Sequence, residues 1–163
     1  MEYLWAGWRS AYVKGVDAVP ADECVFCRMP EHDDEAAFIL DRGEHAYSVL
    51  NLYPYTTGHL IVVPYRHTAD LDDLRPEESA DVWSLLGRGV TACRAALEPQ
   101  GFNLGANLGR IAGAGIPDHV HFHVVPRWAG DTNFMSTVGH TRVLPEDLPT
   151  TWRAIRAALA GAG

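Results

Sequence analysis

Apolar residues along the chain form short runs whose length and borders predict β-strands. Residues 36–40 and 45–52 flank a DRGE turn, and the HLIVVP segment at 59–64 is a compact apolar run closed by a proline. Short apolar runs bounded by turn residues are typical of strands. Residues 101–108 and 119–126 have the same character and predict two more strands.

A different spacing follows Pro76, where apolar residues recur every three or four positions. This spacing predicts an amphipathic helix that ends before Pro99. A proline and two glutamates suit its first turn. The backbone N–H that proline lacks would have no partner inside the helix there, and the carboxylates lie near the positive end of the helix dipole. Cys93 falls on the apolar stripe and is expected to be a small buried hydrophobe. A last helix is predicted over about residues 146–160.

The order of these elements predicts an α+β domain with a mainly antiparallel sheet, one long helix packed across it and a C-terminal helix. Residues 1–35 are expected to be irregular, and residues 110–115 are expected to form a glycine-rich loop. No repeat or linker divides the 163 residues, so we expect a single domain over residues 1–163.

Charge and composition exclude several classes of protein. The net charge of −8 argues against binding to nucleic acid or to anionic membranes. Lys14 is the only lysine, and the chain has neither a GK[ST] phosphate loop nor a GxSxG nucleophile elbow. No apolar run reaches membrane-spanning length, and the N-terminus lacks the apolar block of a signal peptide. We therefore expect a soluble protein of the cytoplasm.

Three histidines alternate with apolar residues in the segment HVHFHVV, at His119, His121 and His123. On a strand, alternation places the three imidazoles on one face and the apolar side chains on the other. Eight histidines in 163 residues would give about 0.02 such rows by chance. The row therefore requires a specific explanation.

Three interpretations of the row remain open: solvent-facing histidines of an ordinary strand, a metal site, and nucleophilic catalysis at phosphorus. Neutral imidazole is an available nucleophile near pH 7, and histidine is also a common metal ligand. The loop before the row favours catalysis at phosphorus, because glycine-rich backbone can present amides to an anion. The residues that suit this role are Gly105, Asn107, Gly109, Arg110, Gly113 and Gly115.

Over about residues 20–130 the sequence resembles the histidine-triad (HIT) family. The resemblance rests on HVHFHVV at residues 119–125, and on Asn51 followed by Gly58 and HLIVVP. It implies a HIT-like fold with an N-terminal aromatic arm, a C-terminal helix and a homodimer whose sheet continues across the two-fold axis. The opening segment, CVFC and the PRWAGDTNFM segment are similar to bacterial diadenosine tetraphosphate phosphorylases and hydrolases.

The resemblance implies that His121 attacks the α-phosphorus of a nucleotide and is transiently nucleotidylated. It implies that His123 contacts the phosphate oxygens and that His119 holds the geometry of the site. The other residues expected near the nucleotide are Asn51 at the ribose, Asn107, Gly113 and Gly115 at the phosphates, His59 as a buried supporting histidine, and Trp128, which could stack on adenine or cover a partner subunit. Gly115 and Ile116 stand where many relatives carry a polar pair that assists the leaving group.

The expected substrate is a dinucleoside polyphosphate, with water or phosphate completing the reaction. Two alternatives keep the same row of histidines. One is hydrolysis of a nucleoside phosphoramidate, and the other is an adaptor that binds AMP or a related nucleotide without turnover.

Cys24 and Cys27 form a CVFC knuckle that could supply two thiolates to zinc. Zinc is favoured over a redox pair because a thioredoxin-like βαβ context is absent. The resemblance extends to relatives of galactose-1-phosphate uridylyltransferase and implies that His67 and His119 complete a closed, structural Cys2His2 site. The alternative is two free thiols with His67 on the surface.

Overall fold

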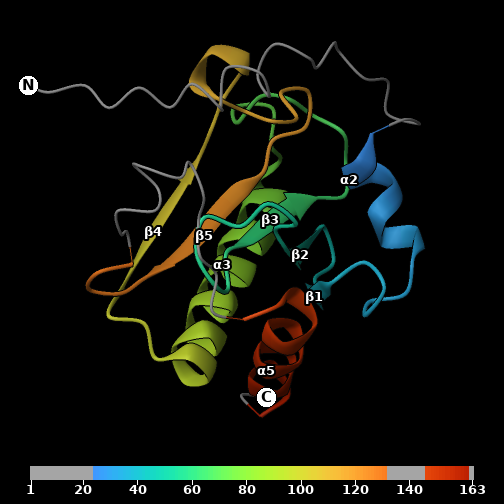
Figure 1. The fold of residues 1–163 in the computed structure, drawn as a ribbon. Coiled ribbons are helices and arrows are strands. Elements are labelled where there is room, and N and C mark those ends of the chain that lie inside the picture. The colour runs from blue at the N-terminus through green and yellow to red at the C-terminus, as the bar shows by residue number, and fades with distance from the viewer. Residues whose placement is uncertain (1–23, 132–145, 162–163) are drawn as a thin grey trace, which may run out of the picture.

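An antiparallel sheet of five strands lies at the centre of the part of the chain that the structure describes (Figure 1). The computed structural model describes residues 24–131 and 146–161. The strands are β1 (Ile39–Arg42), β2 (Ala46–Leu50), β3 (Leu60–Pro64), β4 (Gly101–Ala106) and β5 (Phe122–Arg127). The helices are α2 (Val25–Arg28), α3 (Pro76–Leu97) and α5 (Leu148–Ala160), and the 3-10 turns are η1 (Met29–Glu31) and η2 (Arg110–Ala112). The strand order is β1-β2-β3-β5-β4, which confirms the predicted α+β class with an antiparallel sheet.

The predicted elements exist, but several of their ends lie elsewhere. β1 begins three residues later than predicted, because Phe38 has a left-handed backbone with φ 56° and the pairing with β2 shifts between Ile39 and Asp41. β2 is shorter at both ends than the predicted strand. Residues 25–31, which were predicted to be irregular, form α2 and η1. That prediction was wrong because a CxxC knuckle is itself a helical turn.

The strand predicted over residues 119–126 begins only at Phe122. Before that point, the backbone N–H of Val120 donates to the carbonyl of Thr68 at 2.7 Å instead of joining the sheet. His119 and His121 therefore precede the strand, and only His123 lies within it. The alternation of faces nevertheless holds, because Phe122 and Val124 pack with the core on one face and the histidines do not.

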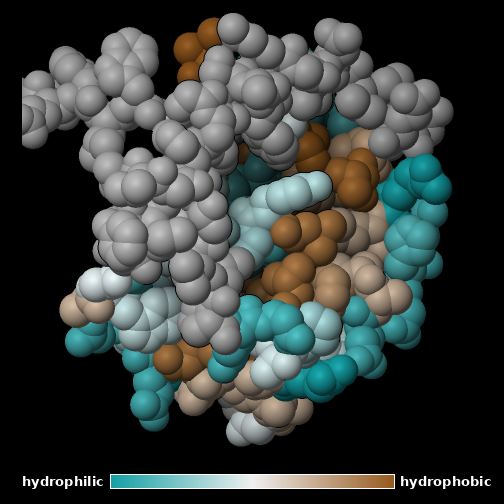
Figure 2. All heavy atoms as spheres, in the orientation of Figure 1, coloured by the Kyte–Doolittle hydropathy of each residue, from teal (hydrophilic) through white to brown (hydrophobic). Residues whose placement is uncertain are grey.

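The two faces of the sheet carry separate apolar clusters. On one face, alternate residues of β2, β3 and β5 pack against α3 and α5. Figure 1 shows α3 behind these strands. On the other face, the intervening residues of β1, β2 and β3 pack with Cys24 and Phe26 of the CVFC knuckle. No long helix of the described chain covers this second face, and Figure 2 shows apolar residues at the surface there, bordered by hydrophilic ones. Among the described residues, the CVFC knuckle packs on this second face and no long helix does.

α3 begins and ends where the sequence predicts. Pro76 occupies its first turn, and a side-chain oxygen of Glu78 accepts a hydrogen bond from the backbone N–H of Arg75 at 2.9 Å. The helix ends at Leu97, and the next residue, Glu98, has a left-handed backbone with φ 49° and precedes a proline. Cys93 is fully buried in the α3 cluster, as predicted, and burial raises the pKa of its thiol to about 12.

α5 covers one edge of the sheet. The indole N–H of Trp152 donates to the carbonyl of Ile39 at 2.9 Å, and Arg156 donates to the carbonyl of Leu40 at 2.8 Å. These two carbonyls belong to β1, the strand at the end of the sheet order. Capping edge carbonyls removes a template for pairing with another chain. The opposite edge strand, β4, lies beside β5 alone among the described strands.

Within residues 24–131 and 146–161, no helix combines the length and the apolar character needed to cross a membrane. The predicted aromatic arm at the N-terminus lies outside the described residues.

Candidate active site and metal centre

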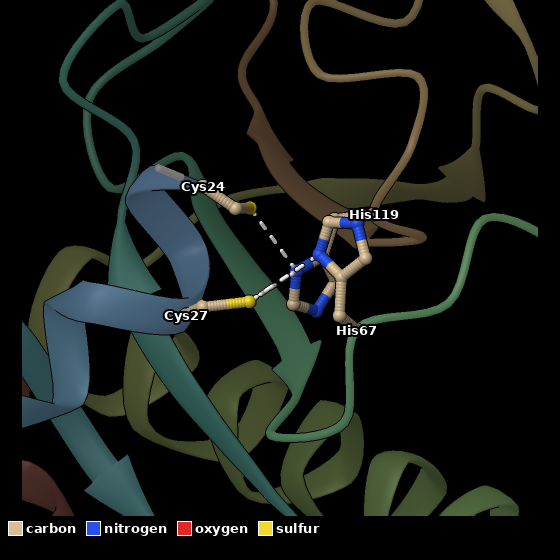
Figure 3. A group of neighbouring side chains, drawn as sticks. All are labelled: Cys24, Cys27, His67 and His119. Atoms are coloured by element: carbon tan, nitrogen blue, oxygen red, sulfur yellow. Dashed lines mark hydrogen bonds between the residues drawn. The ribbon is translucent and has the colours of Figure 1, made fainter. Parts of the chain in front are cut away.

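Four side chains from three distant parts of the chain converge beside the second face of the sheet (Figure 3). Cys24 and Cys27 come from α2 and its N-terminal flank, His67 follows β3, and His119 precedes β5. Their ligand atoms all lie within 4.8 Å of one another. The Nδ1 atom of His119 is 3.4 Å from the sulfur of Cys24 and 3.5 Å from that of Cys27. The Nδ1 atom of His67 is 3.3 Å from the sulfur of Cys27.

These separations fit a metal ion held by two sulfurs and two nitrogens. Zinc–sulfur bonds of about 2.3 Å and zinc–nitrogen bonds of about 2.0 Å, at the tetrahedral angle, set sulfur and nitrogen about 3.5 Å apart. The remaining nitrogen of His119 is already used, because its Nε2–H donates to the carbonyl of Pro64 at 2.9 Å. This bond fixes the tautomer in which Nδ1 carries the lone pair that a metal requires.

Electrostatics in the cluster favours neutral groups until a cation is present. Burial lowers the pKa of His119 to about 4, so its imidazole is neutral at pH 7. Burial, reinforced by the adjacent Cys24, raises the pKa of Cys27 to about 11. A bound cation offsets that penalty, because metal ions deprotonate the thiols that coordinate them. The four residues can therefore hold a divalent metal such as zinc.

His121 lies beside this cluster and is held in one tautomer. Its ring is buried, and its Nδ1–H donates to the backbone carbonyl of His119 at 2.8 Å. A carbonyl can only accept, so the proton is on Nδ1 and the lone pair is on Nε2. Burial lowers the pKa of His121 below its ordinary value, although the bond to the carbonyl opposes the shift. The arrangement produces a neutral imidazole whose lone pair is on Nε2.

His123 has the opposite tautomer, and a chain of two hydrogen bonds fixes it. The backbone N–H of Tyr55 donates to Nδ1 of His59 at 3.0 Å, so the proton of His59 is on Nε2. Nε2 of His59 lies 2.9 Å from Nδ1 of His123 and therefore donates to it. Neutral His123 consequently carries its proton on Nε2, where it is a donor. The rings of His121 and His123 meet edge to face, with centroids 5.0 Å apart.

Sequence reasoning did not identify Tyr55 or Phe26, although both contact the histidines. The Tyr55 ring lies 4.6 Å from that of His59, and the Phe26 ring lies 5.0 Å from that of His121, between centroids. The sequence signal for Tyr55 was its position, four residues before the buried His59. For Phe26 the signal was an aromatic residue between the two cysteines.

Gly105 on β4 has open space at its Cβ position, across the ladder from His123. Gly105 is directly opposite His123 in the β4–β5 ladder, so both positions face the same side of the sheet. A Cβ atom built on Gly105 would meet nothing within 4 Å. Asn107 follows two residues later and is half-buried. The absent side chain leaves space on the side of β4 that His123 also faces.

The glycine-rich loop folds back on itself. η2 occupies its middle, and Gly113, with φ 91°, donates its N–H to the carbonyl of Arg110 at 2.9 Å. The N–H of Ala114 donates to the carbonyl of Gly109 at 3.3 Å. These two amides are therefore engaged within the loop, and contact of Gly113 and Gly115 with a nucleotide stays a prediction. Ile116 packs against the apolar cluster of the second face.

Asn51 lies close to the histidines, whereas Trp128 lies beyond the end of β5. The Nδ2 atom of Asn51 is 3.4 Å from Nδ1 of His59, and its Oδ1 accepts from the N–H of Tyr53 at 2.9 Å. Trp128 follows the end of β5, five residues beyond His123, which is about 16 Å along a strand. A role for Trp128 at the base or at a partner subunit stays a prediction.

An antiparallel sheet with one long helix on its back and a triad of alternating histidines on its front defines the class of histidine-triad α+β proteins. Comparison with known proteins agrees, since residues 33–130 match the HIT domain. The chain belongs to the HIT family.

Two relatives and one solved structure show which members of that family the chain is similar to. The chain is 39% identical over 163 residues to the AP-4-A phosphorylase of Mycobacterium tuberculosis, covering 95% of this chain and 83% of that protein. It is 32% identical over 104 residues to the adenosine 5'-monophosphoramidase of Schizosaccharomyces pombe, covering 64% and 74% of the two chains. A zinc-bound histidine triad family protein from Mycobacterium smegmatis superposes with a TM-score of 0.70 and 33% identity, covering 88% of this chain and 97% of that one.

Proposed function

We propose that this protein is an enzyme that cleaves dinucleoside polyphosphates, of the diadenosine tetraphosphate type, at the α-phosphorus. His121 is the nucleophile, and the reaction passes through a nucleotidyl-histidine intermediate. The observation that carries the proposal is the hydrogen bond from Nδ1 of His121 to the carbonyl of His119, which directs the lone pair to Nε2. The similarity to a protein named AP-4-A phosphorylase supports the class of substrate.

In the first step, Nε2 of His121 forms a bond to the α-phosphorus while the bond from that phosphorus to the bridging oxygen of the leaving nucleotide breaks. In the second step, water or inorganic phosphate attacks the same phosphorus, the nitrogen–phosphorus bond breaks, and its electron pair returns to Nε2. The attacking molecule releases its proton to solvent. Splitting one displacement into two is the general benefit of covalent catalysis.

His123 stabilises the charge that develops on the phosphoryl oxygens. Its Nε2–H is a donor because His59 occupies its Nδ1, and preplaced donors are the main source of catalysis in phosphoryl transfer. Asn51 and Asn107 contact the ribose and the phosphates, and Gly105 leaves the room that the ligand needs. Ile116 is apolar and supplies no donor to the leaving oxygen.

One assay tests the reaction. The protein is incubated with diadenosine tetraphosphate, with and without inorganic phosphate, and AMP, ADP and ATP are separated. ADP and ATP that form only with phosphate indicate phosphorolysis, AMP and ATP indicate hydrolysis, and both results support the proposal. The absence of products from a protein that binds AMP would overturn it in favour of an adaptor.

A trapping experiment tests the nucleophile. Enzyme quenched during turnover should carry an adduct of the mass of AMP on His121, and His121→Ala should show neither adduct nor turnover. His45→Ala is the matched control, because the imidazole of His45 pairs with Glu44 at 3.9 Å rather than with a member of the triad. An adduct on another side chain would remove the assignment.

Hydrolysis of nucleoside phosphoramidates is the second candidate. The similarity to an adenosine 5'-monophosphoramidase favours it, and it requires only a different leaving group at the same phosphorus. Adenosine 5'-phosphoramidate in the same assay separates the two candidates, because the preferred substrate has the higher kcat/KM.

We further propose that Cys24, Cys27, His67 and His119 hold a structural zinc ion. The two sulfurs and two nitrogens form a closed set, as structural zinc sites require, and a solved relative is zinc-bound. The ion would tie α2 to the sheet and fix His119, whose carbonyl in turn orients His121.

We also propose that residues 1–163 form one HIT domain and that two copies pair through β4. α5 caps the β1 edge, whereas β4 is an edge strand whose Leu104 is exposed. Leu108 and Ile111, which follow β4, are exposed as well. Light scattering should give the mass of a dimer, and a monomer would contradict this proposal.

A further inference from the structure

Phe26 is the aromatic residue of the CVFC knuckle. It stands between the two cysteines, yet its side chain points away from the solvent and is only 6% exposed. Its ring meets His119 edge to face with centroids 5.6 Å apart, and it meets His121 at 5.0 Å. One side chain of the metal knuckle therefore contacts both the metal-side histidine and the proposed nucleophile.

Independent contacts hold Phe26 in place. The hydroxyl of Tyr47 donates to the backbone carbonyl of Phe26 at 2.8 Å. Tyr47 is fully buried on β2, and its ring stacks on that of Tyr65 with centroids 5.5 Å apart. The flanking cysteines belong to the metal cluster. The position of the Phe26 ring is thus fixed by the sheet on one side and by the knuckle on the other.

We propose that Phe26 is a positioning residue that holds the imidazole of His121 in the orientation needed for attack. The inference rests on the proposed function, in which Nε2 of His121 is the attacking atom.

The contacts of His121 explain why such a residue is needed. One hydrogen bond, from Nδ1 to the carbonyl of His119, fixes one atom of the ring but leaves the ring able to swing about that atom. The Phe26 ring and the edge of His123 both lie 5.0 Å from His121 between centroids. These two contacts limit the swing, which decides where Nε2 points. A nucleophile displaced by about 1 Å can lose about 100-fold in rate.

The test compares two substitutions of Phe26 with a matched control in the same knuckle. Phe26→Leu keeps apolar bulk without the flat ring, and Phe26→Ala removes both. Val25→Ala is the control, because Val25 also stands between the cysteines but is 48% exposed. For each variant, zinc content, kcat and KM are measured on the full chain, and nitrogen NMR of labelled histidine reports the tautomer of His121.

We expect one zinc per chain in all variants, with kcat reduced about 10-fold in Phe26→Leu and about 100-fold in Phe26→Ala. KM should change about twofold or less, and Val25→Ala should match the wild type. The NMR spectrum should show the Nδ1–H tautomer of His121 in the wild type and a mixture of tautomers in Phe26→Ala. If Phe26→Ala does not fold, Phe26→Leu carries the same comparison.

Two results would overturn the inference. One is an unchanged His121 spectrum in both variants, and the other is a loss of kcat that follows the loss of zinc in proportion. The NMR comparison requires no turnover, so it tests the role of Phe26 even if the wild type cleaves none of the substrates. Absence of cleavage by the wild type would count against the proposed function alone.

Discussion

His119 and His121 are joined through a backbone atom: Nδ1–H of His121 donates to the carbonyl oxygen of His119 at 2.8 Å. The ring of His119 faces the two cysteines, while its carbonyl faces the next histidine of the row. A short stretch of backbone thus connects the Cys2His2 cluster to the proposed nucleophile. In the proposed reaction, one member of the triad would lie at the metal and the next at the substrate.

Removal of the metal should destabilise the protein. If zinc binds the folded state and free zinc exceeds its Kd about 1,000-fold, the ion contributes about 4 kcal/mol to the free energy of unfolding. For a chain of 163 residues, that corresponds to a decrease in Tm of about 8–16 °C on chelation. Thermal unfolding of the protein purified without added metal, before and after a strong chelator, measures the change.

Cysteine variants separate the metal from general effects on the core. Cys27→Ser should lose zinc and show the Tm of the chelated protein. Cys93→Ala should keep one zinc per chain, because Cys93 is buried against α3 and takes no part in the cluster. Zinc absent from a wild-type protein that is stable and folded would contradict the prediction.

Much of this architecture could be predicted from local pattern. The start of α3 follows from a proline with glutamates behind it, and β3 follows from an apolar run closed by Pro64. The start of β5 could not be predicted, because Val120 bonds to Thr68, and His119 turns to cysteines about 95 residues away in sequence. Contacts across such distances are invisible to a pattern of alternating residues.

The candidate site, too, could be predicted from the sequence only in part. The alternation of His121 and His123 indicates which residues share a face, but not that their tautomers differ. Those tautomers depend on a backbone carbonyl and on His59, which lies 64 residues before His123. Phe26 reaches the site through the folding of the knuckle onto β2, which no local spacing encodes.

His59 should control catalysis through His123. His59→Leu keeps apolar volume but removes the Nε2–H that donates to Nδ1 of His123, so the tautomer of His123 is no longer fixed. We expect kcat to fall about 100-fold, the lower end of the range for a general acid or base. His59→Gln, whose amide can donate, should recover part of the loss. Equal activity of the Leu and Gln variants would contradict the role of this hydrogen bond.

The space opposite His123 can be tested at Gly105. Gly105→Leu places a side chain beside the imidazole where a Cβ atom meets nothing within 4 Å, so the protein should fold normally. If the substrate occupies that space, KM should rise about 10-fold or more, which is about 1.4 kcal/mol of binding. Gly101→Leu is the matched control on the same strand, since Gly101 pairs with Arg127 and also has open space. A Gly105 variant with the KM of the control would place the substrate elsewhere.

Acid should lower the free energy of unfolding by protonating Glu78. The guanidinium of Arg66 donates to both oxygens of the Glu78 carboxylate, at 2.8 and 2.7 Å, and lowers the pKa of that carboxyl from 4.5 to about 2. A carboxyl with a lower pKa in the folded state stabilises the protein above its unfolded pKa. That contribution is therefore complete above about pH 5 and is lost as the pH falls towards 2.

Glu78→Gln isolates this contribution, because the amide cannot ionise. At pH 7 the variant should be less stable than the wild type by about 1–2 kcal/mol, the range for hydrogen bonds to a charged group with an exposed partner. The difference should shrink as the pH falls from 5 to 2, since protonated Glu78 loses its ionic partner. Urea unfolding of both proteins across that range measures it, and the comparison cancels the effects of acid on every other group. A difference that stays constant from pH 7 to pH 2 would show that the carboxylate does not act through its charge.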